Sequence, residues 1–71
     1  MYYADIEYVE MMADIWRRKA YAQPEGKENV QKQLFFAASE IVRIFYDPSI
    51  TEEEKNLQIK ALAMETERIA P

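Results

Sequence analysis

The chain of 71 residues carries 13 acidic and 9 basic side chains, which gives a net charge of −4, and it contains neither cysteine nor histidine. Disulfides and thiolate metal sites are therefore excluded, zinc and haem lose their commonest ligand, and the chain lacks the excess of lysine and arginine on which nucleic-acid binding usually depends. We expect one domain over residues 1–71, and because so short a chain buries only about 60% of the surface that its unfolded form exposes, self-association is the simplest way to enlarge its core.

The composition predicts an all-α fold. The chain has one glycine and three prolines, and residues that favour helices, such as alanine, glutamate, methionine and leucine, are plentiful. Apolar residues recur at helical spacing over three segments, at about 4–22, 27–46 and 52–69. We expect a three-helix domain in which the first two helices form a long antiparallel hairpin and the third packs across it.

The first predicted helix, 4–22, has acidic residues near its start and a run of three basic residues near its end, an order that complements the helix dipole. Asp14 also precedes Arg17 and Arg18 by three and four residues, which is the favourable spacing for ion pairs within a helix. The basic run is therefore interpreted as a helix end rather than as a phosphate clamp. Trp16 is the predicted anchor against the second helix, because a tryptophan can bury a large area.

The second predicted helix, 27–46, is apolar over more than half of its circumference, which is typical of a central helix with neighbours on two sides. The middle of its apolar face comprises Val30, Leu34, Ala37, Ile41 and Phe45. Pro24 and Gly26 interrupt the pattern ahead of it, so a short connection joins the two helices as antiparallel neighbours. Phe36 instead projects among polar residues that include Arg43, where an aromatic side chain is either an interface anchor or an incidental exposure.

The start of the third predicted helix, 52–69, has the clearest local signal in the chain. Asp47 and the proline after it end the second helix. Thr51, followed three residues later by Glu54, predicts a capping box. The three glutamates of the first turn suit the positive end of the helix dipole. Since consecutive residues point in different directions around a helix, we favour this capping role over a metal site.

The third helix carries two narrow apolar stripes on opposite sides. One comprises Leu57, Ala61 and Met64, and the other comprises Ile59, Leu62, Ala63, Thr66 and Ile69. One stripe can pack on the hairpin, and the other then needs a second partner or remains in water. The predicted protein interface takes residues from the second and third helices, namely Phe36, Arg43, Ile59, Leu62 and Ile69.

Paired carboxylates are the main enzymatic option that this composition leaves. Glu7, Glu10 and Asp14 share one face of the first helix, but catalytic carboxylates normally need burial to tune their pKa. The neighbouring arginines favour a solvated strip instead. Di-metal bundles use Glu-x-x-His pairs, which a chain without histidine cannot form. We therefore expect no catalytic residue, no cofactor and no bound metal.

These patterns predict a small non-enzymatic protein that works in the cytoplasm. The N-terminal residues are acidic where a signal peptide needs a basic start and an apolar run, and no segment approaches the ~18 apolar residues of a membrane span. We expect a regulator or adaptor that acts by helix-mediated protein–protein contact and forms a homodimeric helical bundle with two-fold symmetry. Neither nucleic acid nor a membrane is an expected partner.

The alternative function is a small acidic inhibitor of the kind that phages and mobile elements encode. Such a protein would cover a basic surface of a host protein by charge complementarity. Its carboxylates would be Glu7, Glu10, Asp14, Glu52, Glu53 and Glu54. The two functions differ in salt dependence, since binding through acidic groups weakens steeply with ionic strength and an apolar contact does not.

Overall fold

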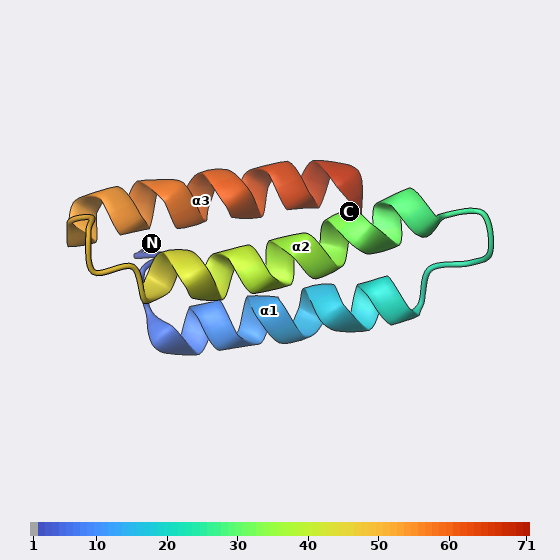
Figure 1. Cartoon of the computed structure of the whole chain (residues 1–71), viewed down its shortest axis with the longest axis horizontal. Coiled ribbons are helices and arrows are strands. Elements are labelled where there is room, and N and C mark those ends of the chain that lie inside the picture. The colour runs from blue at the N-terminus through green and yellow to red at the C-terminus, as the bar shows by residue number, and fades with distance from the viewer. Residues whose placement is uncertain (1) are drawn as a thin grey trace.

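The computed structural model describes residues 2–71 and confirms the all-α three-helix fold. Helices α1 (Ile6–Tyr21), α2 (Glu28–Phe45) and α3 (Glu52–Ile69) lie side by side and alternate in direction, so that α1 and α3 run parallel to each other (Figure 1). The bundle measures 40 × 19 × 18 Å. Within residues 2–71, none of the helices is long and apolar enough to cross a membrane.

The first two helices are slightly shorter than the predicted segments 4–22 and 27–46, because their end residues act as caps. Asp5 has an extended backbone, and its side chain accepts a hydrogen bond of 3.3 Å from the backbone N–H of Tyr8, so α1 begins one residue later. Tyr46 is the C-terminal cap of α2. Boundaries therefore moved by one or two residues, and the order and type of the elements are as predicted.

Helices α1 and α2 form the closely packed antiparallel hairpin. Trp16 is the largest buried side chain and is 2% exposed. It belongs to one core cluster together with buried residues of α2, as predicted for the anchor of the first helix. The other fully buried apolar residues of the two helices are Val9, Ala13, Ala20, Leu34, Ala37, Ala38, Ile41 and Ile44. Four of these residues are alanines, and small side chains in a helix contact let the two helix axes approach.

Two glutamine side chains donate hydrogen bonds to the C-terminal end of α1, next to the α1–α2 connection. Gln31 on α2 donates a hydrogen bond of 2.9 Å to the carbonyl of Ala20, and Gln23 donates one of 3.1 Å to the carbonyl of Lys19. These carbonyls belong to the last turn of α1, where helix geometry leaves four without a partner. Gly26 has a φ of +93°, a conformation that a glycine adopts without steric cost.

The predicted cap of α3 is present in part. The Thr51 hydroxyl accepts a hydrogen bond of 3.1 Å from the backbone N–H of Glu54. The Glu54 carboxylate does not complete the box; it accepts a bond of 3.1 Å from the Gln58 side chain, one turn further along the helix. Ahead of the cap, the Asp47 carboxylate accepts hydrogen bonds from the backbone N–H and the hydroxyl of Ser49.

Helix α3 contributes less to the core than the hairpin does. Its fully buried residues are Ile59 and Thr66, and the Thr66 hydroxyl donates a hydrogen bond of 2.7 Å to the carbonyl of Leu62, which satisfies it inside the bundle. Polar contacts join α3 to the segment before α1 at one end of the bundle, and join α1 to the residue after α3 at the other end. The Asn56 side chain accepts from the backbone N–H of Tyr3 and Ala4 at one end. Lys19 donates to the carbonyl of Ala70 at the other, at 2.9 Å.

Candidate functional site

The candidate sites are two surface regions on separate helices, each of which contains large exposed apolar side chains. The first, here the Phe36 face, lies on the solvent side of α2 and comprises Lys32, Phe36, Ser39, Glu40 and Arg43. Phe36 is 65% exposed. Its neighbours at three and four residues before and after it on the helix are polar or charged. The large aromatic side chain is therefore exposed to water and surrounded by polar and charged residues, as the sequence predicted.

Arg43 lies on the same side of α2 as Phe36, two helical turns further along, and is paired with carboxylates. Its guanidinium donates to the carboxylate of Glu40 and lies 3.8 Å from a carboxylate oxygen of Asp47. The hydrogen bond that Arg43 donates to Glu40 raises the pKa of Arg43 above its ordinary value, and an arginine side chain is a cation in any case. Arginine and aromatic side chains are enriched at the energetic centres of protein interfaces.

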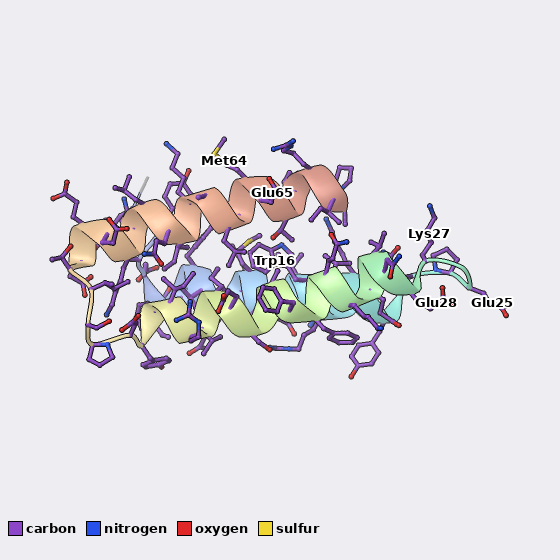
Figure 2. All side chains as sticks on the ribbon, turned by 45° about the horizontal axis from the view of Figure 1, so that its top comes forward. Trp16, Glu25, Lys27, Glu28, Met64 and Glu65 are labelled. Carbon is purple, nitrogen blue, oxygen red and sulfur yellow. The ribbon has the colours of Figure 1, made fainter. Side chains whose placement is uncertain are left out.

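The second region, here the outward stripe, comprises Leu57, Ala61 and Met64 on α3. Leu57 is 54% exposed and Met64 is 60% exposed, and the smaller Ala61 is exposed as well. Met64 projects away from the other two helices (Figure 2). Glu53 and Arg68, both exposed, continue the stripe at its two ends. The stripe is thus a strip of apolar surface on the outer side of the bundle.

The prediction for the two stripes of α3 was wrong for Ile59. Ile59 was expected at a protein interface, but it is fully buried in the core of the chain and has no surface left for a partner. Leu62, predicted beside it, packs partly buried against the same core, and Ile69 is partly buried. The stripe that contains them faces the hairpin, and the Leu57 stripe faces outward.

The charged residues in the sequence do not show which stripe of α3 faces the hairpin. The outward stripe ends in the charged residues Glu53 and Arg68 and has Lys60 at its edge, and the inner stripe also continues into a charged residue, Lys55, four residues before Ile59. Charged side chains are almost never fully buried without a partner. Because both stripes continue into a charged residue, and Lys55 is largely covered and pairs with Glu52 at 3.7 Å, the charges do not identify the side that faces water.

The remaining exposed apolar side chains do not form a comparable region. Tyr21 lies edge-to-face with Phe35 at 5.0 Å, and Tyr46 does so with Phe45, so each is partly covered by its own helix or its neighbour. Met11 lines an open hollow on α1 together with Asp5, Glu7 and Tyr8. Tyr8 lies edge-to-face with Tyr3 at 5.4 Å. Burial raises the pKa of Tyr8, so its hydroxyl is neutral at physiological pH.

The six carboxylates of the alternative function are all exposed. Asp14 forms the expected ion pair with Arg18, at 3.0 Å. Because α1 and α3 run parallel, their acidic first turns lie at the same end of the bundle (Figure 1), and the hydroxyl of Tyr2 donates to Glu52 there, at 2.8 Å. Among residues 2–71 no three carboxylates are placed to hold a metal ion.

The sequence matches no protein-family description, and neither a curated protein nor a solved structure shows detectable similarity to it.

Proposed function

We propose that this chain is a small non-enzymatic cytoplasmic protein that acts by helix-mediated protein–protein contact and associates with itself. One observation carries the proposal. Large apolar side chains remain in water on two separate helix faces, at Phe36 on α2 and at Leu57 and Met64 on α3. Exposed apolar surface with a polar rim is the usual mark of a protein interaction site.

The two faces differ in the partner that they suit. Phe36 is a single exposed aromatic side chain, and the cation of Arg43 lies on the same side of the helix two turns away. An apolar pocket with a carboxylate at its rim would fit this pair, since Phe36 would fill the pocket and Arg43 would meet the charge. The outward stripe is longer, narrow and formed by one helix, which suits another helix packed along it.

Sedimentation equilibrium over a wide range of concentration tests the self-association. We expect the wild-type chain to change from monomer to dimer as its concentration rises. A wild-type chain that stays monomeric at every concentration would contradict the self-association, and the exposed regions would then be sites for a different protein.

The variant Phe36→Ser separates the roles of the two faces. If it remains a dimer like the wild type, the Phe36 face is free for a target. If it becomes a monomer, Phe36 is a dimer anchor. Tyr21→Ser is the matched control, because Tyr21 is aromatic and at least as exposed as Phe36 but lies outside both faces.

The acidic-inhibitor function is the second candidate, and the shared position of the acidic first turns of α1 and α3 favours it. Glu7, Glu10 and the glutamates 52–54 are exposed at one end of the bundle. Binding to a basic protein through this end would weaken at least about tenfold between low and high ionic strength, because exposed charges are screened by salt. Binding that is insensitive to salt would exclude this mode and favour the apolar faces.

A further inference from the structure

The outward stripe of α3 has an order of residues that makes it complementary to itself. Along this stripe the residues follow as Glu53, Leu57, Ala61, Met64 and Arg68, and all five are exposed. Leu57 lies four residues after Glu53, and Met64 lies four residues before Arg68. At the rise of an α-helix the two charged ends are about 22 Å apart. An acid at one end, a base at the other and apolar residues between them are the pattern required for antiparallel pairing.

In an antiparallel pair of two such helices, a single register satisfies both kinds of contact. When Leu57 lies opposite Met64 of a second copy, Glu53 lies opposite Arg68 of that copy, and two-fold symmetry repeats both contacts. A parallel pair would instead place each charge opposite its like. Opposite charges across such a contact are favourable, and like charges are unfavourable.

The middle of the stripe permits the close approach that this register needs. Ala61 lies next to the midpoint, and a small side chain there lets two helix axes approach. Lys60 lies beside it at the edge of the stripe, where its long aliphatic stem can lie along apolar surface with the ammonium in water. The outer side of α3 is free of the other two helices (Figure 1), so a second copy can approach it.

We infer, building on the self-association proposed above, that the chain dimerises through the outward stripe of α3, paired antiparallel with the same stripe of a second copy about a two-fold axis. The occupant of this surface is thus a second copy of the chain. Leu57 and Met64 supply the apolar contact, and Glu53 and Arg68 select the antiparallel direction. The Phe36 face remains outside this interface and is available to a target.

Sedimentation equilibrium of Leu57→Glu tests the location of the interface. The variant places a charge where Met64 of the second copy would pack, and we expect the dimer dissociation constant to rise by at least about tenfold. Phe36→Glu is the matched control and should leave the constant unchanged. If Phe36→Glu dissociates the dimer and Leu57→Glu does not, the stripe is not the interface, although the proposed self-association stands.

Charge reversal tests the direction of the pairing. Glu53→Arg and Arg68→Glu each place like charges opposite one another twice per dimer, and we expect each to raise the dissociation constant about fivefold. The double variant restores opposite charges and should return the constant to near the wild-type value. The two substitutions also oppose the helix dipole, so an effect through helix stability alone would make the double variant the weakest dimer, which would overturn the antiparallel register.

Circular dichroism of every variant at one concentration shows whether the helices are kept. A monomeric wild-type chain would remove the proposed self-association itself. A dimeric wild type whose dissociation constant is unchanged in Leu57→Glu and in both charge variants would refute only the α3 interface. The two failures are therefore distinguishable.

Discussion

The side-chain oxygen of Asn56 accepts a hydrogen bond from the backbone N–H of Ala4, at 3.2 Å, and so joins two residues that are 52 positions apart in the chain. The same oxygen accepts from the backbone N–H of Tyr3. The segment that precedes α1 is thereby attached to the first turns of α3. Since α3 has few fully buried residues, this polar clamp is an important part of its attachment to the bundle.

Removal of the clamp should lower stability. For Asn56→Ala we expect the free energy of unfolding to fall by about 1–2 kcal/mol, because two partly buried backbone N–H groups lose their acceptor. Urea denaturation followed by circular dichroism measures this change. Asn56→Asp is the matched control, since it keeps an acceptor oxygen at the same position, and it should lose less. An equal loss of unfolding free energy in the two variants would show that stability does not depend on the acceptor oxygen of residue 56.

The orientation of α3 can be tested by truncating one residue from each stripe. Ile59→Ala should cost about 2–5 kcal/mol, the usual range for a large-to-small change in a core. Leu57→Ala should cost less, about 1 kcal/mol or below in the monomer, because Leu57 is already 54% exposed in its own chain. Denaturation at a concentration below the dimer range gives both values. A larger cost for Leu57→Ala than for Ile59→Ala would mean that α3 is rotated from the orientation described.

The turn before α3 should show a measurable titration. Hydrogen bonds from the hydroxyl and backbone N–H of Ser49 lower the pKa of Asp47 below its ordinary value of 3.8. A carboxylate with a lowered native pKa stabilises the fold above its unfolded pKa, and this contribution is lost as the pH falls through the native pKa. The contribution of Asp47 is therefore present at neutral pH and lost in acid below the ordinary value.

Ser49→Ala removes the larger of these causes. We expect the pKa of Asp47 to rise toward 3.8 in this variant, and an NMR titration of the Asp47 carboxyl group reads it directly. Ser39→Ala, a change on the exposed face of α2, should leave it unaltered. An unchanged Asp47 pKa in Ser49→Ala would assign the shift to the backbone N–H of residue 49, which the variant keeps, and to the cations Arg43 and Lys55, which also lower it.

Hydrogen exchange should distinguish the three helices. Only Ile59 and Thr66 of α3 are fully buried, whereas α1 and α2 each bury more residues in the shared core. Segments with few buried apolar contacts open at lower free energy, so the backbone amides of α3 should exchange faster than those of the hairpin. Asn56→Ala should increase this difference. Uniform protection across all three helices would instead indicate that the bundle opens as one unit.

Much of the fold was predictable because its signals are local. The spacing of Val30, Leu34 and Ile41 identified the central helix, and Thr51 marked the start of α3 through a hydrogen bond to a residue three positions away. Trp16 was predicted as the anchor from its size and its position on the apolar face of α1. Each of these features depends on neighbours within one or two turns, so the chain order alone contains it.

The contacts between distant segments were not predictable in the same way. Nothing near Asn56 in the sequence indicates that it accepts hydrogen bonds from Tyr3 and Ala4. The position of the acidic turns of α1 and α3 at one end of the bundle likewise followed only from the parallel direction of these helices. For the candidate interface, Phe36 and Arg43 were placed on the exposed side of α2 as expected, whereas Ile59 was not on the surface.

The sequence by itself determined three helices, their order, their ends within two residues, and which residues share a side of each helix. The tertiary structure decided the rotation of α3 about its own axis, and so which of its two apolar stripes is core and which is surface. Periodicity defines the angle between residues on one helix but contains no reference to a neighbouring helix. Packing supplies that reference, because Ile59 fills space against the hairpin while the charged ends of the other stripe, Glu53 and Arg68, remain hydrated.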